Sequence, residues 1–206
     1  MSTIPVQLVR TRSRELVDAL LHLDLHPSKL LETETEWGPI RREAGRRLIR
    51  SGQPPEKIPR HFHWDWTKKS LKLTLLAYRC FGIECEGSMQ GLIMMDLVSK
   101  TARLAPDAGK PLVYVDYLES APWNVSALTD EPKFSTVGFV LMRAAIQLSI
   151  DEGFHGRVGL HSLPQSESFY RDKCFMQFSE MDPSYENLAY FELTRDLSEK
   201  FVRYNI

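Results

Sequence analysis

The segment 133–138 carries the residue types of an anion-binding site. It reads Lys-Phe-Ser-Thr-Val-Gly and opens a periodic apolar stretch that predicts a helix over residues 136–152. The first N–H groups of a helix have no partner within it and carry partial positive charge, so a phosphate or diphosphate binds there readily. Gly138 costs about 1 kcal/mol relative to alanine inside a helix, which suggests close approach of a ligand or a strand. A capped helix after a strand is also a common structural feature, and that is the alternative interpretation.

A second group of polar side chains lies at residues 61–66, where His61, His63 and Asp65 alternate with aromatic residues. In a strand these three side chains would share one side and could hold a metal ion. Aromatic packing is the favoured interpretation, because the chain has no further Cys/His cluster with zinc-site spacing. We therefore expect no metal. Residues 87–91 do not match G-x-S-x-G, and neither GxGxxG nor a P-loop occurs, which disfavours hydrolases and nucleotide-hydrolysing enzymes.

Five arginines stand between residues 41 and 50. They belong to a predicted helix over residues 37–50 whose apolar face contains Ile40, Ala44 and Leu48, so the arginines are interpreted as a solvated face. Contact with an anionic partner such as a charged tRNA is the alternative. Nucleic acid is only a minor expectation, because no aromatic residues alternate with these arginines as base stacking requires.

The composition is that of an ordinary globular domain. Hydrophobic residues make up 43% of the 206 and charged residues 26%, which excludes collagen-like, mucin-like and disordered classes. A chain of this length buries roughly 70% of its unfolded surface, so folding needs neither a disulfide nor a structural metal. A net charge of −1 provides no strong field to attract nucleic acid or a membrane. Three cysteines without a CxxC pair, and no signal-peptide or membrane-helix pattern, lead us to expect a cytoplasmic protein.

Hydrophobic periodicity predicts a mixed α/β (α+β) fold. A strand over residues 6–10 is followed by a helix that begins at Ser13 and carries leucines and an alanine at helical spacing between residues 16 and 23. Residues 68–77 suit either a short helix or a strand. The remaining segments predict a hairpin of strands over 78–85 and 89–98, an apolar central strand over 112–118, the helix over 136–152 ending at Gly153, a strand over 157–161, a short helix over 166–173, and closing strands near 175–178 and 188–194.

The run from the strand over 112–118 through KFSTVGFVLMRAA to SFYRDKCF resembles the GNAT superfamily of acyl-CoA-dependent N-acyltransferases. The resemblance covers about residues 78–194 and is most specific over 112–175. In that family a motif of the form Arg/Gln-x-x-Gly-x-Gly/Ala opens the long helix and cradles the coenzyme A diphosphate. Lys133 stands at the first position and Gly138 at the last. Thr136 replaces the middle glycine, and its hydroxyl can donate a hydrogen bond instead.

A second motif runs from Phe169 to Phe175, where the family shows Phe-Tyr, three residues, then Gly-Phe. Cys174 stands at the position of that glycine. The resemblance implies that Tyr170 protonates the departing thiolate, whereas packing of Phe169, Tyr170 and Phe175 in the core is the alternative. It also implies a mostly antiparallel sheet flanked by helices and splayed after the strand over 112–118, with acetyl-CoA as co-substrate. The implied cofactor-binding residues are Lys133, Phe134, Ser135, Thr136, Val137, Gly138 and Ser166.

Acyl transfer to an amine needs a base, because an amine with a pKa of about 10.4 is only about 0.04% unprotonated at pH 7. Glu119, at the end of the central strand, is the first candidate and Asp116 the second. In a regular strand the two side chains point to opposite faces. Pro122 and Trp123 suggest that the strand breaks just after Glu119 and opens a slot for the pantetheine arm. A solvated or ion-paired carboxylate is the alternative for each acid.

We therefore expect one domain over residues 1–206, with acceptor-side elements in 1–77, the acyl-CoA-binding core in 78–194 and a tail in 195–206. The expected function is transfer of an acyl group, here acetyl, from coenzyme A to a primary amine by direct attack in a ternary complex. The acceptor is a small-molecule or peptide amine, no membrane is involved, and a homodimer is compatible with the sequence. The alternative is a non-catalytic acyl-CoA-binding or protein-interaction module, because Thr136 replaces the motif glycine.

Overall fold

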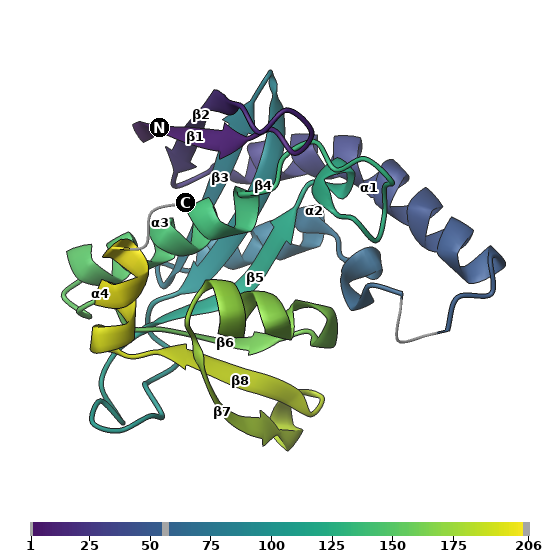
Figure 1. The fold of residues 1–206 in the computed structure, drawn as a ribbon. Coiled ribbons are helices and arrows are strands. Elements are labelled where there is room, and N and C mark those ends of the chain that lie inside the picture. The colour runs from purple at the N-terminus through teal and green to yellow at the C-terminus, as the bar shows by residue number, and fades with distance from the viewer. Residues whose placement is uncertain (1, 55–57, 204–206) are drawn as a thin grey trace. The chain divides into compact units, whose positions relative to one another are not determined.

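The computed structural model describes residues 2–54 and 58–203, and within them eight strands form one mixed sheet (Figure 1). The strand order is β1-β2-β3-β4-β5-β6-β8-β7. β5 and β6 pair in parallel, whereas β1 with β2, β2 with β3, β6 with β8 and β7 with β8 pair antiparallel. The strands are β1 Ser2–Val9, β2 Leu16–Leu23, β3 Tyr78–Cys85, β4 Ser88–Asp96, β5 Val113–Ser120, β6 Val158–Ser162, β7 Gln177–Asp182 and β8 Leu188–Leu193. The mostly antiparallel α/β prediction is confirmed.

The described part of the chain also contains α-helices. They are α1 Pro27–Arg50, α2 Trp66–Lys69, α3 Val137–Asp151 and α4 Arg195–Arg203. The predicted long helix corresponds to α3 and is followed by Gly153, whose positive φ of 76° suits a residue without a Cβ. No helix among residues 2–54 and 58–203 combines the length and the apolar character needed to cross a bilayer.

The first predicted helix is wrong, because residues Leu16–Leu23 form strand β2. β2 pairs antiparallel with β1 along its whole length, and it also pairs with β3. Ala19 and Leu21 are buried while Leu16 and Leu20 are exposed, so the burial alternates as in a strand. A short apolar run fits both the helical period and the strand period, and backbone hydrogen bonds to two neighbouring strands stabilise the strand conformation here.

Helix α1 is longer than predicted and buries a different face. It begins at Pro27, where the His26 side chain accepts a hydrogen bond from the Ser28 amide. Ile40, expected in the core, is 46% exposed, whereas Arg41 is fully buried. The interpretation of every arginine in this helix as solvated is therefore wrong for Arg41. Leu30, Glu34, Trp37, Arg41 and Ala44 share the buried face at helical spacing.

Most of the later elements follow the sequence, but the closing strand predicted near residues 175–178 is β7, Gln177–Asp182, and Phe175 lies before it with a positive φ of 57°. The predicted hairpin is formed by β3 and β4, whose connecting residues Glu86 and Gly87 both have positive φ. The short helix predicted over 166–173 is instead a 3₁₀ turn, Pro164–Ser166, and a π-helical turn, Phe169–Lys173. Residues 61–66 do not form a strand, because Arg60–His63 is a 3₁₀ turn that leads into α2. The ambiguous segment after it is helical, with a 3₁₀ turn over Ser70–Thr74.

The internal contacts divide the chain into two compact units. The first comprises Met1–Leu76, Cys80–Leu92 and Glu119–Gly138, and the second comprises Ala77–Arg79, Ile93–Leu118 and Phe139–Ile206. Fully buried side chains of the first unit include Leu8, Leu30, Trp37, Trp66 and Phe134. Those of the second include Leu112, Val158, Leu193 and Phe201. The single domain expected from the sequence stays a prediction.

Candidate functional site

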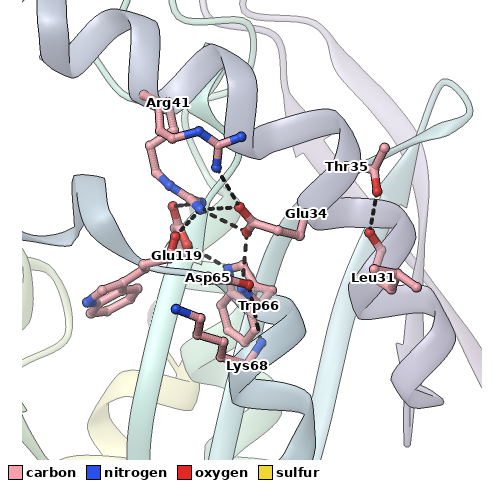
Figure 2. A network of polar contacts seen from close by, with 10 residues as sticks. Leu31, Glu34, Thr35, Arg41, Asp65, Trp66, Lys68 and Glu119 are labelled. Atoms are coloured by element: carbon pink, nitrogen blue, oxygen red, sulfur yellow. Dashed lines mark hydrogen bonds and ion pairs between the residues drawn. The ribbon is translucent and has the colours of Figure 1, made fainter.

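Glu119 lies near the end of β5 and is only 3% exposed, yet both of its carboxylate oxygens have donors (Figure 2). Nη1 of Arg41 donates to Oε1 at 2.8 Å. The indole Nε1 of Trp66 donates to Oε2 at 2.6 Å. Side chains from α1 and α2 therefore hold the carboxylate in one orientation, and charge-assisted bonds of this length are among the strong ones.

Arg41 is shared between two carboxylates. Its Nη2 lies 2.8 Å from each carboxylate oxygen of Glu34, and the same nitrogen donates to the backbone oxygen of Trp64. Glu34 also accepts from the backbone amide of Trp66 at 3.0 Å. Because Glu34 and Arg41 are seven residues apart on α1, two helical turns place them on one face. The result is a buried network that joins α1, α2 and the end of β5.

Electrostatics in this network favour a carboxyl that can take up a proton. Burial raises the pKa of Glu119 to about 7, against the opposing effects of the Arg41 charge and the Trp66 hydrogen bond; the Glu34 charge raises it further. For Arg41, burial by itself would lower the pKa, but Glu119 and Glu34 outweigh burial and raise it. Arg41 therefore stays charged, and the raised pKa brings Glu119 closer to its protonated form at neutral pH than an exposed glutamate would be.

His61 lies beside this network on the 3₁₀ turn Arg60–His63. Burial, with the charges of Arg41 and His63, lowers the pKa of His61 to about 4, so its imidazole is neutral at pH 7. Its ring packs edge-on against that of Trp64, with centroids 5.7 Å apart. Asp65 caps α2 by accepting from the Lys68 amide at 3.2 Å. Within the described residues, no three potential ligand side chains gather into a metal site.

Three amides of the segment 133–138 are bonded within the first unit. The amide of Lys133 donates to the Trp123 oxygen, that of Phe134 to Oδ1 of Asn124, and that of Ser135 to the Val9 oxygen, each at 3.0 Å. These contacts fix the segment against β1 and against the 3₁₀ turn Pro122–Asn124, which follows β5 as the sequence suggested. The backbone amides of this segment that remain for a ligand therefore lie after Ser135.

Thr136 stands directly before α3 and is 9% exposed. Its Oγ1 accepts a hydrogen bond from the Val9 amide at 3.0 Å, which leaves the hydroxyl hydrogen available for another acceptor. The amides of Val137 and Gly138 lie in the first turn of α3, where no helix carbonyl is available to them. This helix start can thus offer one hydroxyl and two amide donors to an anion.

Lys133 is engaged with a carboxylate. Its Nζ lies 2.6 Å from Oε2 of Glu86, and Glu86 also forms an ion pair with Arg10. The two cations lower the pKa of Glu86 through hydrogen bonds and charge. Because Lys133 and Glu86 are both more than one-third exposed, water and salt screen their attraction. Lys133 can therefore exchange this partner for a more highly charged anion.

The remaining predicted residues belong to the second unit. Asp116 is half-buried on β5 and interacts with neighbouring groups there. Ser166 ends the 3₁₀ turn Pro164–Ser166 and its amide donates to the Leu163 oxygen at 2.8 Å. Tyr170 is buried on the π-helical turn, and burial together with nearby Cys174 raises the pKa of its phenol.

Four buried residues of the first unit were missed at the sequence level: Glu34, Arg41, Trp66 and Gln90. Oε1 of Gln90 accepts from Nε1 of Trp123 at 2.8 Å and from Nδ2 of Asn124 at 3.0 Å, and its backbone oxygen accepts from the Ala121 amide. Glu34 and Arg41 have one detectable signal, because they share the helical spacing of Leu30, Trp37 and Ala44. Nothing in the sequence marks Gln90.

No protein-family model matches this sequence, and no curated protein matches it significantly. Solved structures do match. The PaiA N-acetyltransferase of Thermoplasma acidophilum, in complex with coenzyme A, is 16% identical, with coverage of 84% of this chain and 97% of that one and a TM-score of 0.52. The aminoglycoside acetyltransferase AAC(6')-Ib, in complex with coenzyme A and kanamycin, is also 16% identical, with coverage of 87% and 98% and a TM-score of 0.54.

FeeM, an N-acyl amino acid synthase from uncultured soil microbes, is 12% identical, with coverage of 88% of this chain and 94% of that one and a TM-score of 0.54. These structures span nearly all of their own length on this chain, so the likeness covers the whole fold rather than one motif. At such low identity it concerns the fold and leaves the chemistry to the residues. The protein therefore has the fold of the GNAT acetyltransferases, as its sequence motifs predicted.

Proposed function

We propose that this protein transfers an acetyl group from acetyl-CoA to a primary amine of a small molecule or peptide. One observation carries the proposal: a fold shared with coenzyme A-bound acetyltransferases positions Glu119, a carboxyl whose burial raises its pKa to about 7, near the end of β5. The similar structures have acceptors such as kanamycin or make N-acyl amino acids. We also propose that the protein is cytoplasmic.

The residues at the start of α3 fit the diphosphate of coenzyme A. The Thr136 hydroxyl and the amides of Val137 and Gly138 are donors directed to one helix end, where the helix dipole favours an anion. Lys133 adds a positive charge once it leaves Glu86. Phe134 and Ser135 support the segment through their bonded amides. The assignment of Ser166 to coenzyme A binding stays a prediction from the sequence.

Bound acetyl-CoA supplies an activated acyl group as a thioester. Glu119 accepts the proton of the ammonium form of the acceptor, and its raised pKa lets it do so near pH 7. The amine nitrogen then forms a bond to the acyl carbon as the carbon–sulfur bond breaks. As the amide forms, its nitrogen loses a second proton to solvent. We assign to Tyr170 the donation of a proton to the departing sulfur, and solvent then restores the proton of the phenol. Asp116 is the second candidate for the base.

A non-catalytic acyl-CoA-binding module is the competing function. The observation that favours it is the engagement of both Glu119 oxygens by Arg41 and Trp66, which is also how a purely structural carboxylate is held. Under this alternative the protein binds the thioester and does not turn it over.

Thermal unfolding with and without acetyl-CoA tests binding first. At one hundred times Kd, one-site linkage stabilises the protein by about 2.7 kcal/mol, or on the order of 5 to 10 °C in Tm. If millimolar acetyl-CoA causes no shift in Tm, both functions are contradicted. Assays of coenzyme A release across a panel of amines then separate them: turnover that falls in Tyr170→Phe and Glu119→Gln supports transfer. Binding without turnover supports the module.

A further inference from the structure

We propose that Arg41, anchored by Glu34, is a positioning residue that holds the Glu119 carboxylate ready to accept the proton of the amine. This inference rests on the proposed function and adds to it the part of the site that prepares the base. The contacts in Figure 2 carry it, since Arg41 reaches Glu119 with Nη1 and Glu34 with Nη2. One planar guanidinium therefore sets the relative placement of the two carboxylates.

The shape of the guanidinium matters as much as its charge. A lysine ammonium is a point charge and cannot present two nitrogens in a fixed plane. Glu34 holds Nη2 with both oxygens at 2.8 Å and is itself fixed by the Trp66 amide, so the anchor does not rotate freely. Each carboxylate oxygen of Glu119 accepts one hydrogen bond and retains a lone-pair position for the incoming proton.

The network has a cost that a purely structural element would avoid. Arg41 is completely buried, and its Nε has no hydrogen-bond partner among residues 2–54 and 58–203. A buried ion pair is frequently no more stable than well-packed apolar side chains of the same volume. The presence of Arg41 and Glu34 in this core is better explained by their effect on the Glu119 carboxylate than by a contribution to stability.

Charged and polar groups surround Glu119 on α1, on the 3₁₀ turn Arg60–His63 and on α2. From α1, Arg41 favours the ionised carboxylate while Glu34 disfavours it. Arg42, on the same helix, lies 3.5 Å from Glu34 and is half exposed, so its effect is screened. From the 3₁₀ turn, His61 is neutral and faces Arg41. Trp66 of α2 adds an uncharged donor. The two α1 side chains should therefore move the protonation of Glu119 in opposite directions.

The test is a titration of the Glu119 carboxyl carbon by NMR in the full chain labelled with ¹³C-glutamate, with Glu119→Gln for assignment. Arg41→Gln should raise the midpoint by about one pH unit or more, and Glu34→Gln should lower it. Arg46→Gln, which removes an exposed charge from the same helix, should leave it unchanged. Equal midpoints in all variants, or shifts of the same sign for Arg41→Gln and Glu34→Gln, overturn the proposal.

Kinetics separate this inference from the proposed function. Arg41→Lys keeps the positive charge but loses the planar pair of guanidinium nitrogens. We therefore expect kcat to fall by about 100-fold, with an unchanged KM for acetyl-CoA and only a small shift in the titration midpoint of Glu119. An unchanged kcat contradicts positioning. If Arg41→Gln does not fold, Glu34→Gln and Arg41→Lys carry the test. If Arg41→Gln and Glu34→Gln shift the midpoint in opposite directions but the wild-type protein shows no turnover with any amine, the proposed function fails while the control of Glu119 by Arg41 stands.

Discussion

Trp66 and Glu119, which are 53 positions apart in the sequence, are joined by a 2.6 Å hydrogen bond from the indole Nε1 to Oε2. Both side chains are buried, Trp66 completely. The bond ties α2 to the end of β5 and occupies one oxygen of the proposed base. Its removal should therefore affect stability and the protonation of Glu119 together.

Trp66→Phe should destabilise the protein by about 2 kcal/mol or more, because it leaves a cavity and removes a donor from a buried carboxylate. The pKa of Glu119 should rise above its value of about 7, since the Trp66 hydrogen bond favours the ionised form. Urea unfolding measures the first effect and ¹³C NMR titration the second. Trp64→Phe, at a half-buried ring, is the control and should cost less than half as much. Equal losses in the two variants contradict the special role of Trp66.

Replacement of the two candidate acids should give different kinetic results. Glu119→Gln should lower kcat/KM by about 100- to 10,000-fold, the usual contribution of a general base, with an unchanged Kd for coenzyme A. Asp116→Asn, at the half-buried position, should change kcat/KM by less than about threefold. The comparison is made at pH 8 under substrate-limiting conditions. The reverse pattern assigns the base to Asp116.

Thr136 should contribute to coenzyme A binding through its hydroxyl. Thr136→Val removes the donor and also leaves the Val9 amide without its acceptor, so Kd for coenzyme A should rise by about tenfold. Thr136→Ser retains the hydroxyl and should stay within about twofold of the wild type. Isothermal titration calorimetry measures both. A Kd that is the same for valine and serine at this position excludes a phosphate contact by Thr136.

His61 should make the protein lose stability as the pH falls from about 6.5 to about 4. Its pKa is lowered to about 4 in the folded state, so over this window the unfolded chain binds the proton and the folded chain does not. The loss approaches about 3 kcal/mol for a shift of this size. Glu119 acts in the opposite sense between about 4.5 and 7, because its folded pKa is raised.

The difference between the wild type and His61→Asn isolates the histidine, since Glu119 is present in both proteins. Urea unfolding at pH 4, 5, 6 and 7 should show this difference shrinking toward low pH. His155→Asn, at an exposed left-handed position that asparagine tolerates, is the control and should follow the wild-type curve. A constant difference across the series means that the pKa of His61 is the same in the folded and the unfolded protein, which contradicts the prediction.

Elements whose signals are local could be predicted from the residues alone. The hairpin of β3 and β4, the apolar strand β5 and the helix α3 with its terminal glycine all follow from period and turn residues within each segment. Local pattern also indicated the donor-rich start of α3 and placed Glu119 near a strand end. These features need no knowledge of distant parts of the chain.

The identity of β2 and the surroundings of Glu119 depend on contacts between distant parts of the chain. Leu16–Leu23 fits both a helix and a strand, and pairing with β1 and β3 selected the strand. Arg41 belongs to a run of arginines that looks solvated, and it is buried because Glu119, 78 positions away, and Glu34 neutralise it. Burying a charge is favourable only when a partner is in place, and such a partner is a property of the folded chain rather than of the local pattern.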